Sequence, residues 1–182
     1  MPNTPRASLG RRRLVAWLID WACILVWVAI TAAIGLPLYL AGIIAPTGYG
    51  GLNLIAALVV VVPVVVGAAW FESRSVAATP GKRVMRLRVR TAGGRPSFQV
   101  ALLRNALKIG VPWLIGHAAV FAIVASSGAA DPVPAWVWLL TGAAYLIPLI
   151  WIGSLFVAGG RTPYDRATGT DVVRDRLGAA TS

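Results

Sequence analysis

The chain has 182 residues, of which 58% are hydrophobic and 13% are charged. Soluble domains carry roughly 25% charged residues, so this composition excludes an ordinary water-soluble domain and predicts an integral membrane protein. The net charge of +11 would suggest nucleic-acid binding in a soluble protein, but the grouping of the basic residues favours membrane topology, and we expect no nucleic-acid partner.

Long segments without charge predict where the chain crosses the bilayer. A helix needs about 20 apolar residues to cross a hydrocarbon core that is ~30 Å thick. Three charge-free segments are long enough: 21–71 for two spans, and 109–130 and 132–160 for one span each. We therefore predict an all-α bundle of four transmembrane helices with a small β element. The expected spans are about 13–35, 52–71, 104–126 and 135–158.

The membrane domain is expected to occupy residues 11–176, between tails at 1–10 and 177–182, which leaves no room for a separate soluble domain. Pro37 is expected to end the first helix, and Gly48–Gly51 is expected to form a turn in the first outer loop. The third helix is expected to begin near Phe98, with Ser97 as its N-cap.

All lysine and arginine residues fall before the first span, between the second and third spans, or after the fourth. The positive-inside rule then places both termini and the loop at 72–98 in the cytoplasm. Arginine far outnumbers lysine, and Ala, Gly and Val are abundant, as is typical of GC-rich bacterial genomes. The expected location is therefore a bacterial plasma membrane, crossed several times.

The loop at 72–98 contains the pattern of a half-buried strand. After a turn at Thr79–Lys82, the residues from Arg83 to Arg90 alternate between apolar and basic side chains, and a period of two indicates a strand. Thr170–Val173 is the expected partner in a small cytoplasmic sheet. The basic side chains would contact anionic lipid headgroups, at about 1 kcal/mol each near the surface; they are Arg83, Arg86, Arg88 and Arg90.

Asp20 is a carboxylate inside the first span, seven residues beyond Arg13 and therefore about 10 Å deeper. A mid-span acid costs roughly 2.5–3.5 kcal/mol on insertion scales, so Asp20 needs a partner from another helix. Arg104 and Lys108, four residues apart on one helix face, are the expected partners. The contact is either purely structural or part of a proton or cation site, and the sequence leaves both interpretations open.

His117 is the single histidine and is expected near the middle of the third span, on the face opposite Lys108. It is either a proton relay or a hydrogen-bond partner between helices. Pro63, Pro112 and Pro148 interrupt three of the spans. Broken helices form transport sites in some carriers, although membrane helices tolerate proline widely.

Residues for covalent or metal-dependent chemistry are not visible in the sequence. No Gly-rich phosphate loop, His/Cys metal cluster or Ser-His-Asp set is present, so we expect no enzyme, no catalytic residues, no metal and no cofactor. Asp165, next to Arg166 in the segment Thr162–Thr170, resembles a turn or helix-cap acid beside a cation.

With these residues in view, the chain resembles the RDD family of bacterial membrane proteins. Arg13-x-x-Ala16-x-x-x-Asp20 is similar to the arginine and first aspartate for which the family is named. Thr79–Arg83 and Arg104 resemble its middle segment, and Tyr164–Val173 resembles its closing segment, which makes Asp165 the third named residue. Pro80 and Tyr164 stand where the family often has leucine and histidine.

The resemblance implies a multi-pass membrane protein and suggests transport, including cation/proton antiport in some members. We therefore expect a small transporter or transport subunit for cations, protons or small solutes, working as a homo-oligomer or with another membrane protein. The alternative is a scaffold that binds a partner or anionic lipids without transport. The expected ion or proton site comprises Arg13, Asp20, Asp165, Arg104 and Lys108, with His117 as a possible relay.

Overall fold

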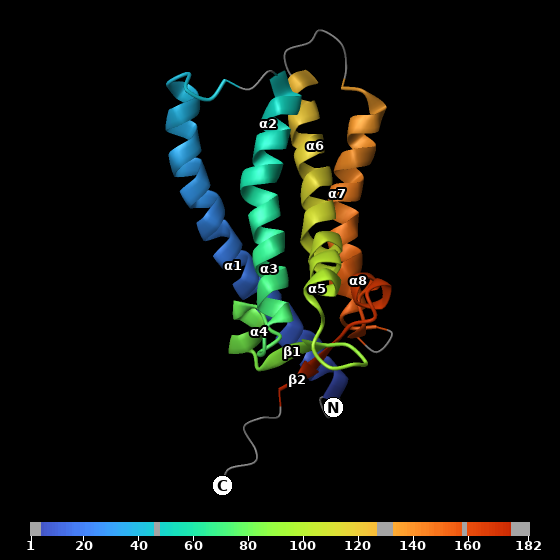
Figure 1. Ribbon diagram of the computed structural model, residues 1–182. Coiled ribbons are helices and arrows are strands. Elements are labelled where there is room, and N and C mark those ends of the chain that lie inside the picture. The colour runs from blue at the N-terminus through green and yellow to red at the C-terminus, as the bar shows by residue number, and fades with distance from the viewer. Residues whose placement is uncertain (1–4, 46–47, 127–132, 158–159, 176–182) are drawn as a thin grey trace.

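Long helical segments stand side by side, and the short elements gather at one end of the bundle, together with the first and last described residues (Figure 1). The structure is a computed structural model that describes residues 5–45, 48–126, 133–157 and 160–175. We call the end that holds the short elements the sheet end. The predicted tail at 177–182 and most of the predicted outer loop before the fourth span lie outside the described residues.

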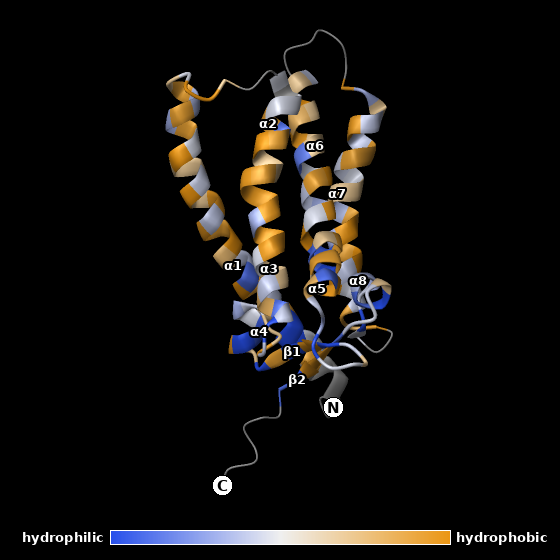
Figure 2. Ribbon diagram, viewed as in Figure 1, coloured by the Kyte–Doolittle hydropathy of each residue, from blue (hydrophilic) through white to orange (hydrophobic). Residues whose placement is uncertain are grey.

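The described residues contain four helical segments that are long and apolar enough to cross a membrane, as predicted. Hydrophobic residues cover these segments along their length, whereas hydrophilic residues gather at the sheet end (Figure 2). The segments are Leu9–Leu40, Gly50–Ser73, Phe98–Ser126 and Ala135–Ser154.

The first helix, α1 (Pro5–Leu40), is longer than predicted at both ends. The prediction that Pro37 ends it is wrong, because Pro37 lies inside α1 one turn before its end, where a missing N–H costs a single helical bond. The predicted turn at Gly48–Gly51 is also wrong, since Gly48 begins the next helix, α2 (Gly48–Ala56). In lipid a backbone group needs an internal partner, which favours helix over an open turn.

The second and third spans each contain a π-helical segment shortly before a proline. The second consists of α2, η1 (Ala57–Val61) and α3 (Val62–Ser73), and the third consists of α5 (Phe98–Asn105), η2 (Ala106–Gly110) and α6 (Val111–Ser126). A proline lacks the N–H and its ring clashes with the carbonyl four residues earlier, and a wider π turn relieves that clash. The Val59 carbonyl, four residues before Pro63, accepts a hydrogen bond from Trp27 Nε1 at 3.2 Å.

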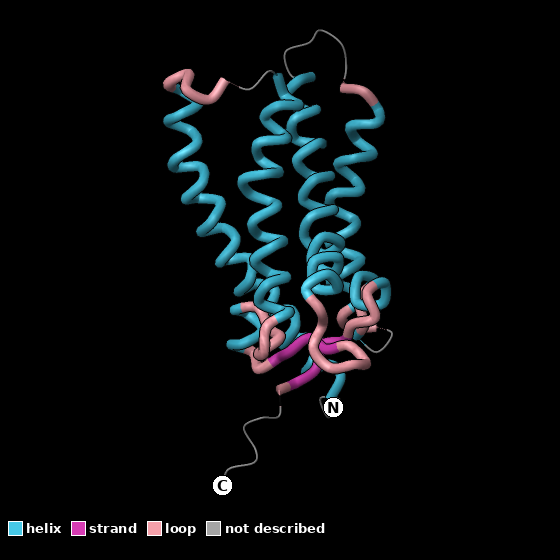
Figure 3. Tube along the Cα trace, viewed as in Figure 1, coloured by secondary structure: helices cyan, strands magenta, loops and turns pink. Residues whose placement is uncertain are grey.

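A two-stranded antiparallel sheet lies at the sheet end, as predicted (Figure 3). Strand β1 (Leu87–Arg90) pairs with β2 (Asp171–Arg174), with Leu87 opposite Arg174 and Arg90 opposite Asp171. The buried side chains of Leu87, Val89 and Val172 form a small core with Ala16 of α1. The apolar face of the sheet therefore rests on the first span.

The first part of the predicted strand is helical instead. Residues Pro80–Val84 form the short helix α4, so the alternation that begins at Arg83 becomes a strand only from Leu87. Pro80 at the first helical position has the fixed φ that a helix start requires. Ser97 caps α5 as predicted, because its hydroxyl accepts a hydrogen bond from the Val100 N–H.

The fourth span, α7 (Ala135–Ser154), ends earlier than the predicted residue 158. It is followed by α8 (Pro163–Ala167), which begins with a capping box: Thr162 and Asp165 each accept from the other's backbone N–H. The capping box fixes the Asp165 carboxylate at the sheet end.

Candidate functional site

Asp20 lies where α4 begins against α1. Its Oδ1 accepts a hydrogen bond from the Gly81 N–H at 2.8 Å, and its Oδ2 accepts one from the Thr79 hydroxyl at 2.7 Å. The first N–H groups of a helix have no partner within the helix, so Asp20 supplies one for α4 from a different helix. Lys82 Nζ lies 4.0 Å from Oδ2 and forms the ion pair of Asp20.

The prediction that Asp20 contacts Arg104 or Lys108 is wrong. Within the described residues the ion pair of Asp20 is to Lys82, and Arg104 pairs with other carboxylates. The broader expectation, that a cation from a neighbouring segment partners this acid, is confirmed. The sequence analysis misses Lys82 because the helix that presents it, α4, resembles a turn in the sequence.

Gly81 allows α4 to lie directly on α1. A Cβ at residue 81 would be 2.0 Å from the Ala16 carbonyl oxygen and 2.9 Å from Asp20 Oδ1. No side chain fits in that space, so any other residue at position 81 would push α4 away from the Asp20 carboxylate.

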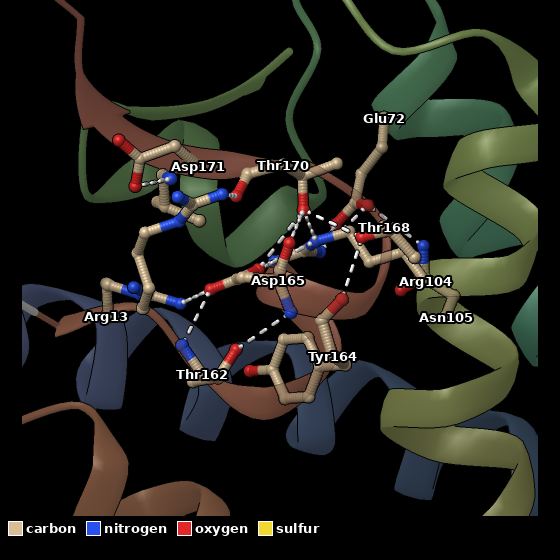
Figure 4. Close-up of polar contacts among 12 residues, drawn as sticks. Arg13, Glu72, Arg104, Asn105, Thr162, Tyr164, Asp165, Thr168, Thr170 and Asp171 are labelled. Carbon is tan, nitrogen blue, oxygen red and sulfur yellow. Dashed lines mark hydrogen bonds and ion pairs between the residues drawn. The ribbon is translucent and has the colours of Figure 1, made fainter. Parts of the chain in front are cut away.

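Arg104 lies between two carboxylates that come from different spans and segments (Figure 4). Its Nη1 donates to both oxygens of Glu72, at 2.8 and 2.9 Å. Its Nε and Nη2 donate to Asp165 Oδ1, at 3.0 and 2.7 Å. The side chain is only 1% exposed, so both pairs are fully desolvated.

Asp165 also receives the guanidinium of Arg13 from α1, which additionally donates to the Gly160 carbonyl. The structure thus brings together Arg13 and Asp165, 152 residues apart, as well as Arg104. The pKa of Asp165 lies well below its ordinary value: burial alone would raise it, but the charges of Arg104 and Arg13 outweigh burial.

Glu72 is a functional residue that the sequence analysis misses. It is 0% exposed, and it accepts hydrogen bonds from Lys82 Nζ at 2.7 Å and from Asn105 Nδ2 at 2.9 Å in addition to those from Arg104. A signal was available, because Glu72 is the single acid between Trp21 and Ala130, a segment that contains many basic residues. In the sequence pattern, however, Glu72 marks only the start of the loop at 72–98.

We call these buried, connected charges the ion network. Its carboxylates and its cations are equal in number, so their formal charges cancel. Removing one member of such a pair costs about 3–5 kcal/mol because the other is left uncompensated. The ion network consists of Asp20, Glu72 and Asp165 with Arg13, Lys82 and Arg104.

A cavity of about 390 Å³ lies beside the ion network, bounded by residues of α1, α6 and α7. We call it the central cavity. Lys108 and His117 both line it, so the prediction that they lie on opposite faces is wrong. That prediction assumed a straight α-helix, whereas Lys108 lies within the π-helical segment η2 and Pro112 follows shortly after.

Aromatic side chains form much of the wall of the central cavity. Trp21 and Trp113 stack with their ring centroids 5.6 Å apart, and Trp17 lies edge-on to Trp21 at 5.7 Å. His117 Nε2 accepts a hydrogen bond from Trp113 Nε1 at 2.6 Å. Trp151 packs edge-on against Tyr164, at 5.3 Å.

A second cavity, of about 320 Å³, lies next to the central cavity. It shares Asp20, Lys108 and Ile109 with the central cavity. Lys108 therefore borders both spaces. It belongs to none of the ion pairs of the described part of the chain.

The basic residues that were predicted to meet lipid headgroups differ in their surroundings. Arg83, Arg86 and Arg90 are exposed, whereas Arg88 is half-buried and pairs with Asp175. Arg83 also lies over the ring of Phe71, at 5.3 Å. No group of His, Cys, Asp and Glu suited to a metal ion is found among residues 5–45, 48–126, 133–157 and 160–175.

Comparison with known proteins identifies the family of the chain. No curated protein and no solved structure matches the chain. The model of the RDD family matches residues 6–130, which is more than half of the 182 residues and includes Arg13, Asp20 and Arg104 but not Asp165. The four apolar helices, the closing of the sheet onto α1 and this match together lead to one conclusion: the chain belongs to the RDD family of membrane proteins.

Proposed function

We propose that this chain is a small membrane transporter, or the membrane subunit of one, that receives a small solute in the central cavity. The observation that carries the proposal is the central cavity itself, with its volume of about 390 Å³. Ligand pockets range over roughly 300–1,000 Å³, whereas the interiors of proteins are otherwise close-packed.

Prolines in two helices of the cavity wall support the proposal. In an α-helix, the residues at 112 and 148 would donate to the carbonyls of Lys108 and Ala144, but both are prolines and have no N–H. All four residues line the central cavity. Backbone carbonyls without a helical donor at membrane depth are tolerated where they border a cavity.

The contacts of Asp20 favour a structural role for this residue over a role as the group that binds and releases a transported ion. Both oxygens of Asp20 already accept hydrogen bonds from Thr79 and Gly81. A cation that bound there would compete with the charge of Lys82, which lies 4.0 Å from Oδ2. This geometry favours small solutes over cations or protons as the transported species, and cation exchange through Asp20 is the alternative within this proposal.

The experiment tests whether water and solute reach the central cavity from both sides of the membrane. Cys23 is the single cysteine, so a Cys23→Ala chain provides the background for Gly116→Cys in the central cavity. Leu139→Cys is the control, because Leu139 is 75% exposed on the outside of α7 and would face lipid. Right-side-out and inverted vesicles are treated with a membrane-impermeant thiol reagent, which reacts with the thiolate.

Modification of residue 116 from both sides, with none at residue 139, is the result expected of a transport pathway. Protection of residue 116 in both vesicle orientations would overturn the proposal. Proteoliposomes with a sodium or a pH gradient then test the cation alternative. Flux that is abolished by Asp20→Asn in a folded protein would assign a cation or proton to Asp20.

A second candidate function, anionic-lipid binding, is supported by the surface near α4. Arg74 stacks on Trp70 with its guanidinium 3.4 Å from the ring centroid. Trp70 is 51% exposed and Val84 is 66% exposed, and Arg83 lies on the same segment. Aromatic rings and cations that occur together are typical of the interface between bilayer and water. Retention of phosphatidylglycerol by the purified protein, reduced in Arg74→Gln with Arg83→Gln, would support this function.

A further inference from the structure

Lys108 is a lysine within a membrane span with no hydrogen bond and no ion pair among the described residues. An intramembrane charge is costly and normally pairs with a neighbouring group. The cations around it, Arg13, Lys82 and Arg104, all have carboxylate partners. Among the described residues, Lys108 is therefore the cation of this region that no carboxylate contacts directly, and Asp20 and Glu72 act on its charge only from a distance.

The charges that line the central cavity indicate whether its ligand is an anion or a cation. The ion network is neutral in formal charge, and adding Lys108 makes the region positive. The carboxylate of Asp20 already accepts hydrogen bonds from Thr79 and Gly81 and pairs with Lys82, so its charge is balanced before a cation enters. An anion would meet Lys108 directly.

The aromatic wall indicates which uncharged group the ligand carries. Trp17, Trp21, Trp113 and Trp151 all line the central cavity. Indole rings stack with planar aromatic groups, and each such pair contributes beyond its buried area. The His117 ring adds no free acceptor at Nε2, because that atom already accepts from Trp113.

From these observations we infer that the central cavity binds an aromatic anion, whose negatively charged group pairs with Lys108 and whose ring lies among the indoles. The inference rests on the proposed function for its physiological meaning, since it names the solute class that the proposed transporter would take. Binding itself does not require transport. The negatively charged group would be the carboxylate of a soluble aromatic acid.

Binding of 2-naphthoate to the purified protein in phosphatidylcholine nanodiscs tests the inference, with bound ligand measured by equilibrium dialysis. Lys108→Met keeps the length of the side chain and removes the charge. We expect the affinity for 2-naphthoate to fall about 10- to 100-fold, as for the loss of a hydrogen bond to a charged group. The apparent Tm of the ligand-free variant should rise, because an unpaired intramembrane charge is removed.

Two controls separate the site from general effects. Arg90→Met removes a cation from the exposed edge of the sheet, outside the central cavity, and should keep wild-type affinity. The neutral amide of 2-naphthoate should bind wild type and Lys108→Met equally weakly. Equal 2-naphthoate affinity in wild type and Lys108→Met, or no binding in the wild type, would overturn the inference.

Adding phosphatidylglycerol to the nanodiscs tests the competing occupant, an anionic lipid headgroup. Unchanged binding of 2-naphthoate in the wild type supports the aromatic-anion site, whereas full displacement of 2-naphthoate by phosphatidylglycerol would assign Lys108 to a lipid phosphate and overturn the inference. Binding with residue 116 protected in the vesicle experiment would support the site and refute transport. Labelling of residue 116 from both sides without 2-naphthoate binding would refute the aromatic-anion site alone.

Discussion

Single buried charges carry much of the stability at the sheet end. Glu72 and Arg104 are almost completely enclosed, and each is bonded to more than one partner. When one charge of such a cluster is removed, the remaining buried charges lose their compensating partner. The effects of substitutions should therefore depend far more on burial than on the number of ion pairs.

Glu72→Gln should destabilise the protein by about 3–5 kcal/mol, because Arg104 and Lys82 would each lose a buried counter-charge. The measurement is the apparent Tm in detergent. Asp175→Asn is the matched control, since its ion pair with Arg88 is about one-third exposed, and such pairs contribute below about 1 kcal/mol. Equal shifts for the two variants would contradict this account.

Gly81→Ala should separate α4 from α1 and release the Asp20 carboxylate. The added Cβ would meet the Ala16 carbonyl oxygen at 2.0 Å, a backbone atom that cannot rotate away. Gly93→Ala is the control because nothing lies within 4 Å of its Cβ position. We expect a large fall in Tm for the first variant and a change within about 0.5 kcal/mol for the second. Similar Tm values would rule out the close approach.

At the scale of elements, the backbone donor that Pro63 removes from the second span is replaced by a side chain of the first span. The carbonyl of Val59 lies one helical turn before Pro63 and accepts the indole N–H of Trp27 from α1. A side chain of one span thus replaces the backbone donor that the next span lacks.

A double-mutant cycle tests this compensation. Trp27→Phe removes the indole N–H and leaves the Val59 carbonyl unpaired, so it should destabilise the protein. In a Pro63→Ala background, residue 63 regains its own N–H, and the cost of Trp27→Phe should become smaller. Tm values for the wild type and the three variants give the coupling. Additive effects would show that the Trp27 bond does not serve the carbonyl freed by the proline.

The sequence is sufficient to predict the elements that depend on local pattern. Charge-free length predicts the four spans, alternation from Arg83 to Arg90 predicts a strand of which Leu87–Arg90 forms β1, and Ser97 predicts the start of α5. These signals are local because they arise from bilayer thickness, the strand period and one capping bond.

The partners within the site could not be predicted in the same way. Pro80–Val84 is too short to be stable as an isolated helix, and it depends on Asp20, which lies on another helix. The π-helical segment at Ala106–Gly110 changes the face on which Lys108 lies, and simple periodicity assumes that this face stays constant. Which carboxylate pairs with Arg104 depends on packing between spans, which spacing along the chain does not encode.

For the whole molecule, the ion network joins the first, second and third spans to the closing segment through Arg13, Glu72, Arg104 and Asp165. The lowered pKa of Asp165 therefore makes the stability of this assembly depend on pH. The folded state holds Asp165 ionised at pH values where an unfolded aspartate, with a pKa of about 3.9, takes up a proton. Stability from this group is complete above about pH 4 and is lost as pH falls towards the lowered pKa.

Asp165→Asn should lower the Tm at pH 7 and should flatten the fall in Tm below about pH 4, because the titrating group is gone. Tm measured against pH for the wild type and the variant checks both effects. Asp171→Asn, in the neighbouring strand β2, should keep the wild-type slope. Parallel curves for wild type and Asp165→Asn would show that acid sensitivity has another origin.

The long separation of Arg13 and Asp165 along the chain has a consequence for biosynthesis. A ribosome delivers Arg13 first and Asp165 152 residues later, so nascent chains that end between Arg104 and Asp165 hold both arginines without this counter-charge. A product truncated between Ser154 and Asp165 keeps all four spans yet leaves Arg13 without its carboxylate partner. Such fragments would insert into the membrane but remain recognisable to quality-control proteases as incomplete.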